Sequence, residues 1–128
     1  MKEIMIGTKN TSEVTVTKEL SALSAGSGEL LVYATPMMVA LMENSAANCI
    51  KSFLNDGETT VGTYVEVSHT SATPLGMKVT ATSEVVAVNG REIEFIIEAS
   101  DERGIIGNAK HKRFVVNSEK FQQKTNSK

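Results

Sequence analysis

The sequence has few of the features that mark secreted, membrane-spanning or nucleic-acid-binding proteins. Its one cysteine, Cys49, excludes an internal disulfide framework and fits a reducing compartment. No apolar run approaches the roughly 20 residues that a membrane helix needs, and the start, MKEIMIGTKN, lacks the apolar segment and cleavage site of a signal peptide. The net charge of −2 leaves no positive excess for a nucleic acid. We therefore expect a cytoplasmic protein without a membrane or nucleic-acid partner.

What remains is the composition of an ordinary globular protein. Hydrophobic residues make up 41% of the 128 residues, which is enough for one hydrophobic core but not for two. We expect a single domain over residues 1–128. Residues 118–128 are polar and end in QQKTNSK, so we expect this tail to fray.

One long helix is expected over residues 35–57, TPMMVALMENSAANCIKSFLNDG. Thr35 suits the N-cap, Pro36 suits the first helical position, and the run Asn55-Asp56-Gly57 supplies a stop. The apolar positions form a stripe of Val39, Ala46, Ala47, Ile50 and Leu54, widened by Met38, Met42, Cys49 and Phe53. We interpret Cys49 and the methionines as packing residues. A helix this apolar must be wrapped by other elements, and a sheet is the expected cover.

The rest of the chain alternates with period two, as β-strands do. Five strands are expected, over residues 11–17, 61–69, 77–88, 91–100 and 105–116. The pair Val85-Val86 indicates a β-bulge, Asn89-Gly90 is a strong hairpin turn, and residues 21–28 fit a loop or short lid of small residues. Four of the strands follow the helix, which predicts an antiparallel meander.

The order of strand, helix and four further strands predicts an α+β fold. A five-stranded antiparallel sheet can bury one long, mostly apolar central helix by wrapping around it, which is the hotdog fold. Such a sheet leaves a face to be covered or a long edge strand to be paired. We therefore expect a homodimer, or a dimer of dimers, with a ligand cleft at the interface.

Three side chains are candidates for chemistry. Glu43 lies within the apolar stripe, where a carboxylate is costly unless it is paired or used, although at the edge of the stripe it could reach solvent or a lysine. His69 ends the first strand after the helix, and a lone strand histidine is more often structural than catalytic. Thr35 is explained as an N-cap, but a helix start also offers free N–H groups to a developing oxyanion.

The remaining candidates each have two interpretations. Gly62 within a strand marks a bulge or the close approach of another group. Arg113 is either an ion-pair partner at the rim of the sheet or a pocket residue. His111, on the same strand face, is interpreted as structural. Lys110 and Lys112 could meet phosphates, but they fit a solvated strand face better.

Taken together, three segments resemble one known family. They are YATPMMVALME at residues 33–43, VGT at 61–63 followed by VSHTSATP at 67–74, and GNAKHKR at 107–113. They resemble the fluoroacetyl-CoA thioesterase-like family of hotdog proteins over roughly residues 14–124. The combination is specific, because it joins a threonine that opens the helix, a glutamate eight residues later and a histidine before TSATP.

The resemblance implies a thioesterase that hydrolyses short-chain acyl-CoA. It implies that Thr35, Glu43 and His69 are catalytic and that Gly62 and Arg113 line the acyl pocket. It also implies no metal and no cofactor other than the coenzyme A that forms part of the substrate.

Helix geometry limits how these residues cooperate. Thr35 and Glu43 are about 12 Å apart along a straight helix, so they cannot hydrogen-bond directly, and substrate and water or a second subunit must bridge them. We expect His69 to act as general base, oriented or charged by Glu43, while Thr35 attacks the carbonyl or positions the water that does. Alternatively, Glu43 is the base or nucleophile and His69 supports the leaving thiolate. A non-catalytic acyl-CoA or acyl-carrier binding module is a second interpretation, and a hotdog hydratase or dehydratase a third.

The segment before the helix bears on substrate choice. Selecting a fluorinated two-carbon acyl group needs a tight, dry pocket, because a small apolar difference is worth only about 1–3 kcal/mol. No aromatic residue occurs before Tyr33, and LSALSAGSG at residues 20–28 is small and flexible. We expect a modest, broad preference for short acyl-CoAs.

Overall fold

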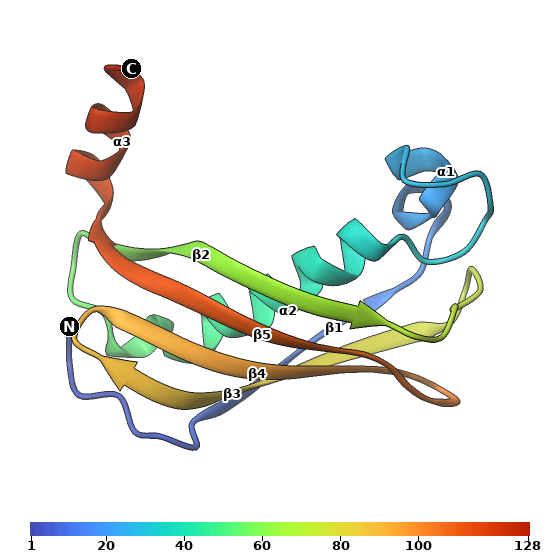
Figure 1. The fold of residues 1–128 in the computed structure, drawn as a ribbon, viewed down its shortest axis with the longest axis horizontal. Helices are drawn as coiled ribbons and strands as arrows, with labels where there is room; N and C mark the ends of the chain where they lie inside the picture. Colours follow the sequence, from blue (N-terminus) through green and yellow to red (C-terminus); the bar gives the residue numbers. More distant parts are fainter.

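The computed structural model describes residues 1–128 and has one curved sheet with one long helix (Figure 1). In chain order the elements are β1 (Lys9–Thr15), α1 (Ala22–Ala25), α2 (Thr35–Ile50), β2 (Glu58–His69), β3 (Lys78–Asn89), β4 (Glu92–Asp101), β5 (Gly104–Asn117) and α3 (Ser118–Asn126), with short 3-10 turns at Lys18–Leu20 and Lys51–Phe53. All strand pairs are antiparallel. The five-stranded sheet around a central helix confirms the predicted hotdog fold.

The order of strands in the sheet is β1-β3-β4-β5-β2. Strands β3, β4 and β5 form the predicted meander, but β2 does not lie beside β3. It pairs with β5 at the far edge, and β1 takes the place next to β3. The alternation that identifies strands does not say which of them pair, and the connection from β2 to β3 is long enough to cross the sheet. Both β1 and β2 are therefore edge strands.

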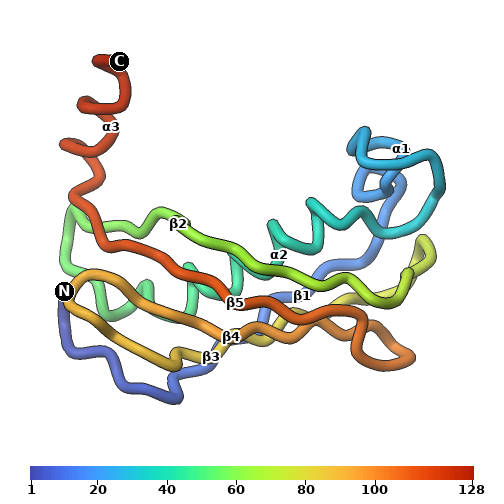
Figure 2. The backbone as a smooth tube through the Cα atoms, in the orientation of Figure 1, coloured from blue at the N-terminus to red at the C-terminus, as the bar shows by residue number.

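Helix α2 runs along the inner face of the sheet, behind the strands in the views of Figures 1 and 2. Its most buried side chains are Met38, Leu41, Met42, Ser45, Ala46, Cys49 and Ile50. They pack on the inward-facing residues of the strands, among them Val79, Ala81, Val85, Ile93, Phe95, Ile97 and Ala99. The helix packs mainly against β1, β3 and β4 and less against β2 and β5. As a result, Val39 and Ala47 of the predicted stripe lie at its edge and are only partly buried.

The ends of α2 differ from the sequence prediction. The helix begins with Thr35 itself and Ala34 occupies the N-cap, so the predicted capping role of Thr35 is wrong. At the other end the helix stops at Ile50 and tightens into a 3-10 turn, and Gly57 follows in a turn with φ of +82°. None of the helices is long and apolar enough to cross a bilayer.

The register of the sheet shifts at three places, one in each of the β3–β4, β2–β5 and β4–β5 pairs. The register of β3 shifts between Val85 and Ala87, as the Val85-Val86 pair predicts. A second shift, in β2 between Gly62 and Tyr64, leaves Thr63 without a partner across the sheet and lies at the glycine that the sequence marks as a bulge or a close approach. The second bulge matters for the site, because it turns the strand beside Gly62.

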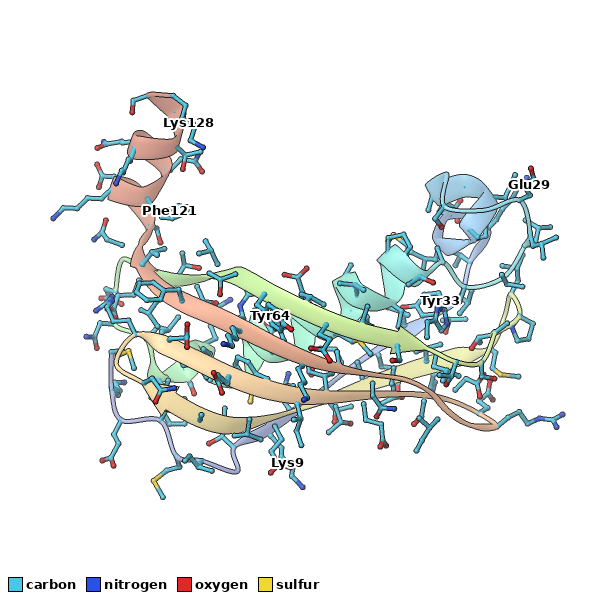
Figure 3. The ribbon with its side chains drawn as sticks, viewed as in Figure 1. Lys9, Glu29, Tyr33, Tyr64, Phe121 and Lys128 are labelled. Atoms are coloured by element: carbon cyan, nitrogen blue, oxygen red, sulfur yellow. The ribbon has the colours of Figure 1, made fainter.

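The polar tail forms a helix in place of the frayed segment that its composition predicts. Helix α3 is capped by the side chain of Asn117, which accepts a hydrogen bond from the backbone N–H of Lys120. It projects from the end of β5, and Phe121 and Lys128 mark its course in Figure 3. All of its side chains are exposed, so local capping, and not burial, gives it its form.

Candidate active site

Thr35 and His69 form a hydrogen-bonded pair. Thr35 lies at the start of α2 and His69 at the end of β2, and the Thr35 Oγ1 and His69 Nδ1 atoms are 2.7 Å apart. When Nδ1 carries no proton, the hydroxyl donates to it, and the imidazole is then placed to take the hydroxyl proton. This contact explains why the Thr35 side chain does not cap its own helix.

The surroundings of His69 keep its ring neutral. Burial lowers the pKa of His69 below its usual value of 6.5. The ring of Tyr33 meets the imidazole edge-on, with centroids 6.5 Å apart. Burial also raises the pKa of Tyr33 to about 12, and its hydroxyl donates to the carbonyl of Met37. The Nε2 atom of His69 is buried and has no hydrogen-bond partner in the chain.

A hollow of about 270 Å³ opens beside this pair. It lies between the α1 segment and the end of β2, and its walls include Thr35, His69, Ala22, Ser27, Val32 and Ser71. A larger hollow of about 590 Å³ lies on the outer face of the sheet, among Lys9, Glu66, Glu84, Glu98 and Lys110. That outer hollow contains none of Thr35, Glu43, His69, Gly62 and Arg113, whereas the smaller hollow contains Thr35 and His69 and is the candidate substrate site.

A second cluster surrounds Arg113 on β5. Its Nη1 lies 3.3 Å from Glu43 Oε2 and 3.2 Å from His111 Nε2, while Nε and Nη2 donate to the hydroxyl and carbonyl of Thr60 at 2.8 and 3.1 Å. Arg113 is only 8% exposed, whereas the Glu43 side chain is 40% exposed. Glu43 thus lies at the edge of the apolar stripe and pairs with an arginine, not with a lysine.

Gly62 leaves the space that the Glu43 carboxylate occupies in this arrangement. A Cβ atom at Gly62 would lie 2.7 Å from Glu43 Oε2 and 3.3 Å from His111 Cε1. The absence of a side chain at Gly62 lets the carboxylate lie against β2, and a Cβ atom there would make the end of the Glu43 side chain shift. Both interpretations of Gly62 therefore hold, since it adjoins a bulge and accommodates a close approach.

The structure brings the predicted residues together as two separate groups. Thr35 pairs with His69, and Glu43, Gly62 and Arg113 meet about two helical turns away. No hydrogen bond joins Glu43 to the Thr35–His69 pair, so Glu43 does not orient His69 within one chain. The distance along α2 is the reason, as helix geometry predicts.

Sequence reasoning missed two members of the second group, Thr60 and His111. The signal for His111 was its shared strand face with Arg113, but its hydrogen bond to Arg113 depends on side-chain geometry that alternation does not give. Lys110 is exposed on the outer face, and Lys112 pairs there with Glu94 at 3.4 Å. Both lysines therefore point away from the hollow beside Thr35.

Comparisons with known proteins identify the family of the chain. Residues 16–119 match the family model described as FlK, fluoroacetyl-CoA-specific thioesterase. The fluoroacetyl-CoA thioesterase of Streptantibioticus cattleyicolor is 40% identical over 97 residues, which are 76% of this chain and 70% of the relative. A solved structure of the fluoroacetyl-CoA thioesterase FlK is 33% identical, with a TM-score of 0.92 over 99% of this chain and 98% of that one.

A thioesterase superfamily member from Thermus thermophilus is 29% identical, with a TM-score of 0.92 over 99% of this chain and 94% of that one. One solved form of FlK is a complex with acetyl-CoA, at 31% identity and a TM-score of 0.92 over 97% of this chain and 98% of that one. The family match spans both clusters of candidate residues. The chain therefore belongs to the fluoroacetyl-CoA-specific thioesterase family and is a thioester hydrolase with the hotdog fold.

Proposed function

We propose that the protein hydrolyses short-chain acyl-CoA thioesters to a free acid and CoA. The 2.7 Å contact between Thr35 and His69 beside the hollow carries the proposal. In the reaction, oxygen from water bonds to the acyl carbon, the C–S bond breaks, and the thiolate of CoA takes up a proton. The start of α2 offers its positive dipole end to the oxyanion that forms on the carbonyl.

His69 is the general base in this proposal. Its lowered pKa keeps the imidazole neutral at neutral pH, which is the form that accepts a proton. The proton comes from the Thr35 hydroxyl if threonine attacks the carbonyl, or from water that the hydroxyl positions. In the alternative mechanism Glu43 is the nucleophile or base and His69 lies beside the leaving thiolate. Trapping an acyl-enzyme and identifying the modified residue distinguishes the two mechanisms.

The site is composite and is completed by a second copy of the chain. Two observations support this part of the proposal: Glu43 does not reach His69 in its own chain, and β2 is an unpaired edge. Val65 on the inner face of β2 is 39% exposed, since α2 covers this part of the sheet less. A homodimer, or a dimer of dimers, brings Glu43 of one copy to the Thr35–His69 pair of the other. Light scattering at micromolar concentration tests the assembly, and a strictly monomeric, fully active species contradicts it.

The acyl specificity is broad within short chains. Apart from Tyr33 and His69, the hollow is walled by small residues such as Ala22, Ser27 and Val32, and no aromatic residue precedes Tyr33 in the chain. Such walls do not provide the tight enclosure that strong selection of one small acyl group requires. The comparison of kcat/KM for fluoroacetyl-CoA and acetyl-CoA tests this, and a preference above about a thousandfold contradicts it.

Thiol release from a panel of acyl-CoAs tests the function itself, with Glu43→Gln as the paired variant. We expect release from two- to four-carbon acyl groups and a large loss in the variant. Binding of acyl-CoA without any thiol release would instead identify a non-catalytic module. The free Cys49 is buried and unpaired, which supports a reducing, cytoplasmic location.

A further inference from the structure

His111 is a buried histidine whose hydrogen bonds determine its protonation state. It is 1% exposed, and its ring stacks on Phe95 with centroids 6.0 Å apart. Its Nδ1 lies 2.7 Å from the carbonyl oxygen of Tyr64, which only accepts, so Nδ1 carries a proton. Its Nε2 lies 3.2 Å from Arg113 Nη1, which only donates, so Nε2 carries none. The ring is therefore neutral and in a single tautomer.

The two hydrogens of Arg113 Nη1 are shared between His111 and Glu43. The other contacts of the guanidinium go to Thr60, through Nε and Nη2. If Nε2 of His111 stopped accepting, a buried N–H would lose its partner, and the guanidinium would turn toward other acceptors. The direction in which Arg113 presents Nη1 to Glu43 thus depends on His111.

His111 also connects this arrangement to the bulge in β2. The carbonyl that it binds belongs to Tyr64, the first paired residue after the register shift that follows Gly62. The Cβ position of Gly62 lies 3.3 Å from His111 Cε1 and 2.7 Å from Glu43 Oε2. One ring thus contacts both the strand against which the Glu43 carboxylate lies and the cation that binds that carboxylate.

The groups that face His111 come from four elements. Arg113 lies on the same strand, Glu43 comes from α2, Phe95 from β4, and the carbonyl of Tyr64 from β2. Burial is the largest cause that lowers the pKa of His111, with Arg113 adding to it, while the Tyr64 carbonyl and Glu43 oppose it. A protonated ring would direct an N–H at the Arg113 N–H and place two cations together.

We propose that His111 is a positioning residue of the thioesterase site, a neutral acceptor that holds Arg113 and through it sets the place of the Glu43 carboxylate. The inference rests on the proposed function of Glu43. It assigns to His111 a role that depends on one ring nitrogen, Nε2, and not on packing alone.

Two substitutions separate the two ring nitrogens. The amide nitrogen of asparagine falls near the position of Nδ1, so His111→Asn keeps a donor for Tyr64 and loses the acceptor for Arg113. The amide oxygen of glutamine falls near Nε2, so His111→Gln keeps that acceptor. We expect His111→Asn to lower kcat of thiol release by about tenfold or more, and His111→Gln to stay within about threefold of the parent.

A double-mutant cycle with Glu43→Gln separates positioning from structure. If His111 acts through Glu43, His111→Asn has little further effect on kcat once Glu43 is replaced. The inference is overturned if His111→Asn lowers kcat by the same factor in the parent and in the Glu43→Gln protein. It is also overturned if His111→Gln and His111→Asn lower kcat equally. Thermal unfolding of each variant shows that it is folded, and Glu98→Gln on the exposed outer face serves as the unaffected control.

Nitrogen NMR provides a readout that does not need activity. The chain has two histidines, and His111→Gln assigns their signals. We expect His111 to be neutral at neutral pH, with its proton on Nδ1, and a charged ring or an Nε2–H tautomer overturns the inference. If the parent protein releases no thiol from any acyl-CoA, the proposed function fails, while this measurement still decides whether His111 is the acceptor of Arg113.

Discussion

The two clusters of candidate residues differ in how many of their polar atoms have hydrogen-bond partners. In the Thr35–His69 pair one bond joins the side chains, and His69 Nε2 has no partner. In the other cluster Arg113 makes contacts through all three of its nitrogens, and both nitrogens of His111 are bonded. An imidazole whose Nδ1 contacts a hydroxyl beside a hollow can take the proton of that hydroxyl, whereas a saturated cluster keeps its shape. We therefore expect the first cluster to perform proton transfer and the second to position a carboxylate.

The largest expected effects come from removing one member of each cluster. His69→Ala and Glu43→Ala should each lower thioester turnover by at least about a hundredfold, the usual scale for the loss of a general acid or base. Thiol release from the best acyl-CoA of the panel measures both. Parent rates in these variants would show that neither cluster belongs to the active site.

Mixing the two inactive variants tests whether the clusters cooperate across subunits. If Glu43 of one copy serves His69 of the other, a His69→Ala and Glu43→Ala heterodimer has one intact site of two. Co-refolding equal amounts makes about half of the dimers mixed, so we expect recovery to about a quarter of the parent activity. No recovery, with mixed dimers shown by mass spectrometry, places the whole site within one chain.

Substitutions at Thr35 test whether its hydroxyl acts in catalysis or in helix stability. Thr35→Ser retains the hydroxyl that contacts His69 Nδ1 and should stay within about threefold of the parent, whereas Thr35→Ala should lose about tenfold or more in kcat. Because Thr35 is not the N-cap, the alanine variant should unfold at nearly the parent temperature. A large drop in that temperature would mean that the threonine acts through helix stability.

Gly62→Ala tests how tightly the second cluster is built. The added Cβ would displace the end of the half-exposed Glu43 side chain, so we expect kcat to fall by about tenfold and stability by less than about 1 kcal/mol. Urea unfolding measures the stability. In a Glu43→Ala background the obstructing carboxylate is absent, and the same substitution should cost less. An equal cost in both backgrounds would place the strain elsewhere.

The smallest expected effect is on the pH dependence of stability. Burial lowers the pKa of both histidines in the folded state below the 6.5 of the unfolded chain, so the unfolded state binds more protons below about pH 6.5. Stability should therefore be lost as the pH falls from about 6.5 toward the folded-state pKa values. Urea midpoints at about pH 7.5 and 5.5 measure the loss, which His111→Gln should reduce more than His69→Gln because His111 is the more buried.

The sequence predicts the fold well because its elements follow clear periodicities. The alternation in β3, β4 and β5, the Asn89-Gly90 turn and the apolar helix each indicate one structure. The place of β2 was not predictable in the same way, because alternation gives the faces of a strand but not its neighbour. The helix of the tail depends on the Asn117 cap, a local feature that its polar composition conceals.

The sequence predicts a set of candidate residues but not the contacts between them. The family resemblance indicated Thr35, Glu43 and His69, and spacing along α2 indicated that Thr35 and Glu43 cannot bond. That Thr35 contacts His69 depends on how the end of β2 meets the start of α2. The contact between His111 and Arg113 depends on side-chain packing under the β2 bulge. His111, which the sequence suggests is structural, therefore has the positioning role that we propose for it.

The position of α3 has a practical consequence. It projects from one end of the sheet, while α1 lies toward the other end (Figures 1 and 2). The hollow beside Thr35 is lined by Ala22 of α1 and so lies toward that other end. Its side chains are all exposed. A fluorophore, surface tether or affinity label attached to α3 would therefore leave the entrance for substrate unobstructed. This helix is a suitable attachment site for single-molecule or immobilised assays.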